Sequence, residues 1–104
     1  MTVSLVAYWR VEPAGLTSAL RDVVRAKPII ERHGGKVRVQ VPIAGDEPDA
    51  YSVTVECADW AAYGAYMAAL LADREWTTFQ GEVLQREGPT TRLVSQTLWM
   101  DVPL

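Results

Sequence analysis

The chain has 104 residues, a net charge of −3 and a pI near 5.0, and 49% of its residues are hydrophobic. These values are typical of one globular domain, and the lack of a Lys/Arg stripe argues against nucleic-acid binding. The single cysteine, Cys57, excludes an intrachain disulfide, and together with the single histidine, His33, it excludes a Cys/His zinc site.

Targeting and membrane signals are not evident in the sequence. The N-terminal residues lack both a basic start and a long apolar run, so they do not resemble a signal peptide. No stretch approaches the roughly 20 apolar residues that span a bilayer. We therefore expect a cytoplasmic protein with no membrane partner.

The first half of the chain predicts a strand followed by a helix. Residues 2–11 alternate in polarity, which is the pattern of a strand. One phase of this strand consists of Val3, Leu5, Ala7, Trp9 and Val11. Residues 14–33 change to helical spacing. Their apolar side consists of Leu16, Leu20, Val23, Val24 and Ile30. Pro28 predicts a kink or break near Lys27, and the HGG sequence at 33–35 ends the helix.

The next two segments alternate again and are joined by a short polar loop. The apolar phase of residues 36–43 consists of Val37, Val39, Val41 and Ile43. The apolar phase of residues 50–57 consists of Tyr51, Val53, Val55 and Cys57. The loop between them, AGDEPD, is typical of a turn, so we expect an antiparallel hairpin.

The last third of the chain predicts a broken helix and a final strand. Asp59 has the position and side chain of a helix N-cap. The apolar side of the helix that follows consists of Trp60, Tyr63, Met67, Leu70 and Leu71. The sequence ADREW at 72–76 predicts a break, after which Trp76, Phe79 and Val83 share one side of a second helical piece. REGPTT at 86–91 ends that piece, and residues 91–102 form a strand that is apolar in both phases.

The predicted order is β-α-β-β-α-β in a single domain over residues 1–104, which is the ferredoxin-like α+β plan. Its four-stranded antiparallel sheet has both helices on one face and leaves the other face bare. The bare face carries Val6, Tyr8, Arg10, Arg38 and Gln40, together with part of the last strand. Because Val6, Tyr8 and an apolar last strand disfavour contact with water, we expect a homodimer that packs sheet to sheet.

Three stretches carry a resemblance to a known superfamily: VEPAG at 11–15, ERHGGKVRV at 31–39 and AAYGAYMAALLADREW at 61–76. With the element order and length, they resemble the dimeric α+β barrel superfamily, in particular antibiotic-biosynthesis monooxygenases and NIPSNAP-like domains. The resemblance extends from Val3 to about Met100. It implies the fold, but not one activity, because the superfamily includes oxygenases, isomerases, cyclases and haem-degrading enzymes. Residues 59–86 hold no histidine, where the resemblance places the iron ligand of the haem enzymes, so we reject a haem role.

The aromatic residues have two interpretations. They are core and dimer packing, or several of them line a cavity between the second helix and the sheet, where enzymes of the superfamily hold a flat aromatic substrate. The aromatic group consists of Trp9, Trp60, Tyr63, Tyr66, Trp76, Phe79 and Trp99. The substrate-binding candidates are Trp9, Val39, Tyr51, Tyr63, Met67 and Trp76. Among these, we expect Trp9, Tyr63 and Trp76 to form an aromatic box.

The catalytic candidates are Tyr63, Tyr8, Arg10 and His33, each with a structural alternative. His33 is either an exposed residue at a helix end or a general base. Tyr8 and Arg10 belong either to a polar layer inside a dimer or to a site for an anion or carbonyl group. Cys57 is expected to be a small buried residue.

The function expected from these features is a small enzyme without a cofactor. No phosphate-binding loop, dinucleotide motif or metal cluster occurs in the sequence, so we expect neither cofactor nor metal. The substrate would be an aromatic or polyketide-like metabolite, and the reaction a monooxygenation, isomerisation or cyclisation. The alternative is a non-catalytic domain that binds a small molecule or only dimerises.

Overall fold

The computed structural model describes residues 1–46, 49–85 and 91–104. Its elements in chain order are β1 (Val3–Val11), the 3-10 helix η1 (Pro13–Gly15), α1 (Leu16–Arg32), β2 (Lys36–Gln40), β3 (Ala50–Cys57), α2 (Trp60–Ala72), α3 (Arg74–Leu84) and β4 (Thr91–Met100). This confirms the predicted order, with the second helical region divided into α2 and α3. Residues 47–48 of the predicted turn and residues 86–90 of the predicted helix end lie outside the described residues.

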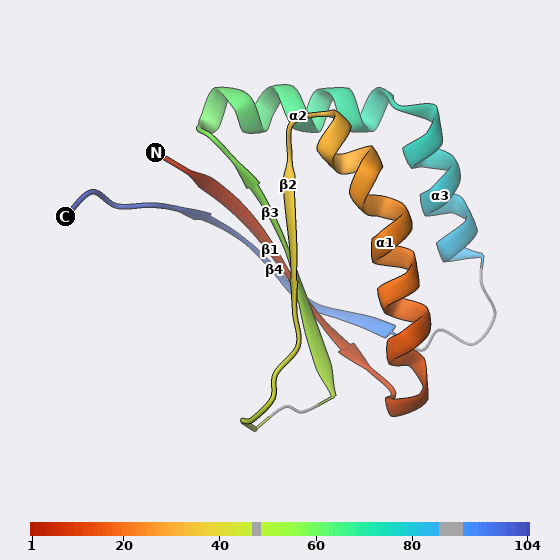
Figure 1. The fold of residues 1–104 in the computed structure, drawn as a ribbon. Coiled ribbons are helices and arrows are strands. Elements are labelled where there is room, and N and C mark those ends of the chain that lie inside the picture. Colours follow the sequence, from red (N-terminus) through yellow and green to blue (C-terminus); the bar gives the residue numbers. More distant parts are fainter. Residues whose placement is uncertain (47–48, 86–90) are drawn as a thin grey trace.

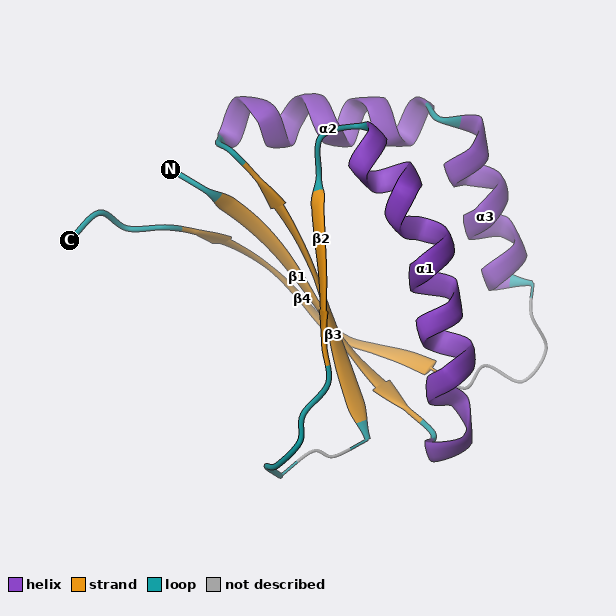
Figure 2. Ribbon diagram, in the orientation of Figure 1, coloured by secondary structure: helices purple, strands orange, loops and turns teal. Residues whose placement is uncertain are grey.

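The four strands form one sheet in the order β2-β3-β1-β4, and every neighbouring pair is antiparallel. All three helices lie on one side of this sheet (Figure 1). α1 packs on β2, α2 packs on β3, and α3 packs against the other two helices rather than along a strand. The architecture is therefore the ferredoxin-like α+β fold, and β4 is an edge strand (Figure 2).

The strand register assigns alternate residues to the two faces of the sheet. Val3 lies opposite Cys57 and Trp9 opposite Tyr51, and these residues face the helices. Val3 and Val11, at the two ends of this phase, are buried. The predicted helix-facing phase of the first strand is thus confirmed, while Ser4, Val6, Tyr8 and Arg10 lie on the open face.

Two clusters of buried side chains form the core beneath the helices. The larger cluster consists of Ala26, Ile29, Ile30, Val55, Cys57, Tyr66, Leu70 and Phe79. The smaller cluster consists of Val11, Ala19 and Tyr51. Trp60 and Leu71 were expected on the buried side of α2 but are exposed, and Tyr66 is the aromatic residue that is deeply buried. α2 is apolar on every side, so residue spacing could not identify which side packs inward.

β2 is shorter than the sequence predicts. The alternation continues to Ile43, but the strand ends at Gln40, and Ile43 is fully exposed. Pro42 lacks a backbone N–H and restricts the residue before it, so the pairing with β3 cannot continue past this point. Val41 and Ile43 therefore do not join the core with Val37 and Val39.

α1 is continuous across Pro28, where the sequence predicts a kink or break. A proline at this position removes the hydrogen bond to the carbonyl of Val24. Val24 is 71% exposed, which is also a departure from the predicted apolar side. We infer from this exposure that the freed carbonyl lies on the solvent side of α1, where water can satisfy it, so the helix need not end.

A β-bulge in β4 explains why this strand is apolar in both phases. Tyr8 lies opposite Ser95, but the next residue, Trp9, lies opposite Leu93, which leaves Val94 as an extra residue. The bulge shifts the alternation by one residue. As a result, Leu93, Leu98 and Met100 all share the helix-facing side, and the open face receives Arg92, Ser95, Thr97 and Trp99.

The open face is consequently more polar than the sequence suggested. One row across it consists of Gln40, Ser52, Tyr8 and Ser95, and the next consists of Arg38, Thr54, Val6 and Thr97. Part of β4 lies on this face, as predicted, but the bulge turns Leu93 to the other side, so the strand adds fewer apolar side chains here than its sequence suggested. Trp99 is the one large apolar residue that β4 contributes there through its paired positions.

Candidate functional site

An exposed apolar surface of the sheet lies on the helix-facing side of β1 and β4. We call this surface the helix-side strip, and it consists of Leu5, Ala7, Leu93, Gln96, Leu98 and Met100. Leu93, Leu98 and Met100 are 44%, 37% and 42% exposed. The packing of α1 and α2 on β2 and β3 therefore leaves β4 uncovered on the same side where the sequence predicts a pocket.

Aromatic side chains stand at both ends of the helix-side strip. At one end the rings of Trp9 and Tyr51 are stacked, with centroids 6.2 Å apart and planes 5° from parallel. At the other end Trp60 Nε1 donates a hydrogen bond to Met100 Sδ at 3.0 Å. The ring of Tyr63 meets Trp60 edge-on at 6.2 Å. The strip is thus bounded by aromatic groups that favour flat ligands.

The two aromatic ends are well separated. Met100 pairs with Val3, which is six residues along β1 from Trp9, and this spacing corresponds to about 20 Å. Trp9, Tyr51 and Val39 pack in the smaller cluster, whereas Tyr63, Met67 and Trp76 pack against the larger one. Trp9, Tyr63 and Trp76 all lie on the helix side of the sheet, but they belong to separate clusters and do not form one contiguous box.

Burial keeps three titratable groups of the core in their neutral form. It raises the pKa of Tyr51 to about 12, with an added contribution from the negative charge of Asp22. It also raises the pKa of Tyr66 to about 12 and raises the pKa of the Cys57 thiol. These groups stay protonated at neutral pH, so none of them is a ready base or nucleophile. Cys57 is buried, as the sequence predicts.

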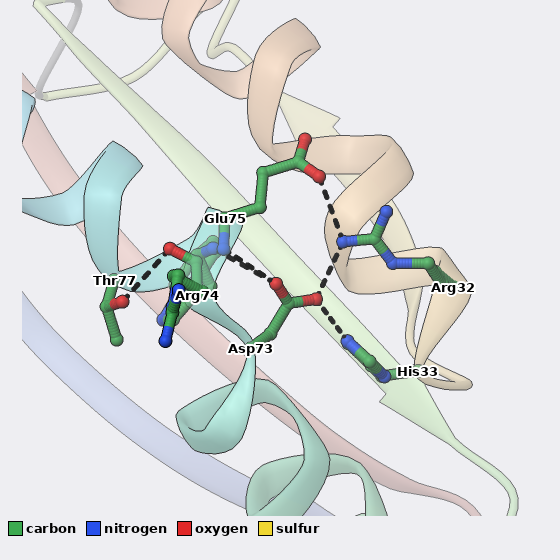
Figure 3. A network of polar contacts seen from close by, with 7 residues as sticks. Arg32, His33, Asp73, Arg74, Glu75 and Thr77 are labelled. Carbon is green, nitrogen blue, oxygen red and sulfur yellow. Dashed lines mark hydrogen bonds and ion pairs between the residues drawn. The ribbon is translucent and has the colours of Figure 1, made fainter.

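His33 takes part in a network that joins α1 to the α2–α3 junction (Figure 3). Its Nε2 lies 2.6 Å from Asp73 Oδ2, and Arg32 donates to the same oxygen at 2.6 Å. Asp73 Oδ1 accepts the backbone N–H groups of Glu75 and Trp76 and so caps α3. The side chain of His33 is only 20% exposed, which corrects the expectation of an exposed residue at a helix end.

The charge state of Asp73 follows from its partners. The hydrogen bonds from His33 and Arg32 hold the pKa of Asp73 well below its usual range. One ring nitrogen of His33 is therefore engaged with a permanent carboxylate, which gives this histidine a structural partner. The sequence signals available for this site were only the ADREW break and the cap position of Asp73, and neither identifies a partner 40 residues away.

A groove of about 540 Å³ lies between α1 and α3, and its apolar residues are Ile29 and Phe79. Arg25 bridges it by pairing with Glu82 at 2.7 Å, and its guanidinium carbon lies 5.0 Å from the centre of the Phe79 ring. Arg32 and Glu75, seven residues further along α1 and seven earlier in α3, form a second ion pair at 3.2 Å. These contacts identify the groove as the packing seam of two antiparallel helices.

A second groove, of about 570 Å³, lies beside η1, where β1 ends and β4 begins. Arg10 and Arg92 are direct cross-strand neighbours in its wall, and Glu12 and Asp49 lie in the same wall. Two positive and two negative groups balance one another there. The charges in the groove therefore give no reason to expect an anion there. Arg10 remains, with Tyr8, one of the predicted catalytic candidates on the open face.

Among residues 1–46, 49–85 and 91–104, no three His, Cys, Asp or Glu side chains are grouped in a way that could hold a metal ion. In the same part of the chain, no helix has the length and apolar character needed to cross a bilayer.

Comparison with solved structures places this fold among known proteins. A NIPSNAP domain protein from Burkholderia xenovorans superposes with a TM-score of 0.71 at 15% identity, covering 98% of this chain and 95% of that one. A mutant of SnoaB from Streptomyces nogalater, a cofactor-independent oxygenase, gives 0.67 at 16% identity, with 99% and 95% covered. A candidate antibiotic biosynthesis monooxygenase from Bordetella bronchiseptica gives 0.67 at 17%, with 98% of both chains covered.

No protein-family model and no curated protein matches the sequence. The structural matches extend over nearly the whole chain, so the predicted resemblance is confirmed at the level of the fold. This chain has the fold that NIPSNAP domain proteins share with antibiotic-biosynthesis-monooxygenase-like proteins.

Proposed function

We propose that this protein binds a flat aromatic or polyketide-like metabolite on the helix-side strip and acts on it without a cofactor. The observation that carries the proposal is the exposed apolar surface of Leu93, Leu98 and Met100, which faces the helices but is not covered by them. Aromatic rings bound this surface at both ends. A planar ligand would remove the apolar area from water and stack on an indole or phenol ring.

The proposed reaction depends mainly on the chemical reactivity of the substrate. An electron-rich phenol or an enolisable carbonyl compound supplies its own reactive carbon once a proton is lost. Once that proton has passed to water, the resulting anion can react with dioxygen, isomerise or cyclise, and apolar walls around the reacting carbon limit side reactions. The fold shared with SnoaB, a cofactor-independent oxygenase, supports oxygenation as the first activity to test.

Tyr63 is the polar group that we place nearest the α2 end of the site. It is half-buried, it contacts Trp60 and Tyr66 through its ring, and its hydroxyl makes no hydrogen bond to another described residue. A ligand oxygen would give this hydroxyl a partner. Tyr63 is therefore proposed to orient the substrate, while Trp9 and Tyr51 supply the stacking surface at the opposite end.

The proposal is tested with metal-free protein and a panel of naphthols and hydroxylated anthracenes. Oxygen uptake and ultraviolet spectra would be followed for the natural chain and for Tyr63→Phe. We expect turnover with at least one member and a loss of about tenfold in affinity or rate in the variant, with unfolding stability changed by about 1 kcal/mol or less.

A second candidate function is non-catalytic binding of the same class of ligand. Two observations favour it: burial raises the pKa of Tyr51 and Tyr66, which keeps both phenols protonated, and His33 is paired with Asp73. Saturable binding of the panel with no oxygen uptake, isomer or cyclised product would support this function over the enzymatic one. Absence of binding would contradict both.

We also propose that two copies pack through their open faces. Val6 and Tyr8 are half-buried in the single chain, and their neighbours carry hydroxyl, amide or charged groups that can hydrogen-bond across an interface. A two-fold axis would place equivalent rows of polar residues opposite each other. The likeness to dimeric α+β barrels supports this assembly.

A further inference from the structure

Gln96 is the one polar residue of the helix-side strip. The other five members, Leu5, Ala7, Leu93, Leu98 and Met100, are aliphatic or carry a thioether. β4 has other polar residues nearby, but the register assigns Ser95 and Thr97 to the open face. Gln96 therefore places a polar side chain among apolar neighbours, where a polar group of a ligand could bind it.

The register places Gln96 opposite the smallest side chain of β1. Its partner is Ala7, and the neighbouring pairs on the same face are Leu5 with Leu98 on one side and Trp9 with Leu93 on the other. Ala7 cannot cover the amide as a larger residue would. Gln96 is exposed, and its side chain makes no hydrogen bond to another residue in the described part of the chain.

An amide in apolar surroundings discriminates strongly between ligands. It carries both donors and an acceptor, and a ligand that covers it without a polar partner leaves those groups unsatisfied at a cost of roughly 1–3 kcal/mol. A ligand with a hydroxyl or carbonyl oxygen at the right place avoids that cost. The strip should therefore prefer oxygenated aromatic compounds to hydrocarbons of the same shape.

The spacing along β1 limits the size of such a ligand. Ala7 is two residues from Trp9, and this separation corresponds to about 7 Å. A molecule of two or three fused rings can stack on the indole of Trp9 and still bring a ring substituent to Gln96. Leu93 and Leu98 lie on either side of Gln96 in the same phase and would contact the edge of the rings.

We propose that Gln96 is a specificity-determining residue whose amide binds a phenolic hydroxyl or carbonyl oxygen of a fused-ring aromatic ligand. The inference rests on the proposed function, because it requires a ligand on the helix-side strip. It adds the chemical feature by which that ligand is selected and the residue that selects it.

The test compares two probes of nearly equal shape, 2-naphthol and 2-methylnaphthalene, by titration of the folded protein. In the natural chain we expect 2-naphthol to bind more tightly. In the Gln96→Leu variant the affinity for 2-naphthol should fall about five- to tenfold, because the hydroxyl of the probe loses the amide that it binds. The affinity for 2-methylnaphthalene should hold or rise, since the variant removes an amide that this probe leaves unsatisfied.

Two further variants make the result specific to this position. Thr97→Val alters the next residue of β4, which faces the other side of the sheet, and should leave the affinity for both probes unchanged. Ala7→Leu fills the space beside Gln96 and should weaken both probes together. Circular dichroism of each variant would verify that the fold is retained.

The outcomes separate this inference from the function on which it rests. If Gln96→Leu leaves the preference for 2-naphthol intact while Ala7→Leu weakens both probes, the strip is a binding site and the role of Gln96 is overturned. If neither probe binds the natural chain, or if Ala7→Leu has no effect on either, both the binding site and the role of Gln96 are overturned.

Discussion

Asp73 joins three helices through its side chain. It ends α2, caps α3 and accepts from His33 and Arg32 in α1 and its C-cap. Three helices are thereby fixed relative to one another by one carboxylate. The arrangement also makes His33 a structural residue of the helix layer.

The lowered pKa of Asp73 makes stability depend on pH in the acid range. A carboxylate with a depressed pKa in the folded state contributes stability that is fully present above its unfolded value, near 4, and is lost as the pH falls through the folded value. The groups facing it are Arg32, His33 and Glu75. We expect Asp73→Asn to be less stable at pH 6 and to lose less stability than the natural chain below pH 4.

Urea unfolding at a series of pH values would measure this difference. Glu75→Gln is a suitable control, because it removes a carboxylate that pairs with Arg32 but does not contact His33. Parallel pH profiles for the natural chain and Asp73→Asn would contradict the role assigned to the carboxylate.

Core side chains pack so closely around Gly35 that there is no room for a larger residue at this position. It is buried just before β2, and a methyl group built on it would lie 2.7 Å from Val55 Cγ1, 2.8 Å from Ile30 Cγ2 and 3.1 Å from Tyr66 Cε1. Gly35→Ala should therefore lower the free energy of unfolding by about 1–3 kcal/mol. Gly64→Ala, at an open position within α2, should raise it by about 0.5–1 kcal/mol. Chemical unfolding of the two variants provides the comparison, and equal effects would refute the contact argument.

Among the elements, α3 is held mainly by other helices. Two ion pairs, Arg25 with Glu82 and Arg32 with Glu75, bracket the contact of Phe79 and Ile29 between α1 and α3. Both side chains of the Arg25–Glu82 pair are about half exposed, so water screens the attraction. Burial of the Phe79 ring is expected to dominate the stability of the seam.

This ranking predicts unequal effects of two substitutions in α3. Phe79→Ala should cost about 3–5 kcal/mol, because it removes a buried ring and leaves a cavity. Glu82→Gln should cost about 1 kcal/mol or less. Denaturant midpoints would establish the order, and a larger loss in Glu82→Gln would show that the ion pair holds α3.

The bulge in β4 has consequences for the whole sheet. By turning Leu93 to the same side as Leu98 and Met100, it gathers the apolar residues of the edge strand on the side of the helices. The open face is left with rows of polar groups around Val6, Tyr8 and Trp99. The two faces of β4 are therefore suited to different partners, with a small aromatic ligand proposed for one and a second copy for the other.

The proposed assembly predicts a mass of twice 11.5 kDa in solution. Light scattering at micromolar concentration should give the dimer for the natural chain and the monomer for Val6→Asp, which places like charges across a two-fold axis. Val24→Asp, on the exposed side of α1, should remain dimeric. A natural chain that scatters as an 11.5 kDa monomer would rule out the assembly.

Local sequence patterns were sufficient to predict the order of the elements, the helix-facing phase of β1, the cap at Asp59 and the break at 72–76. Each of these depends on neighbours within a few residues, through side-chain alternation, helical spacing or capping hydrogen bonds. The end of β2 could also have been inferred locally from Pro42. The fold class followed because few topologies satisfy this order.

The features that define the proposed site depend on contacts between segments that are far apart in the sequence. The extra residue at Val94 depends on how β4 aligns with β1, and the pairing of His33 with Asp73 joins segments 40 residues apart. α2 is apolar on all sides, so only packing selected Tyr66 for the core. Exposure of Leu98 and Gln96 on the helix side likewise depends on where α1 and α2 rest on the sheet, because no local pattern specifies which strands the helices leave uncovered.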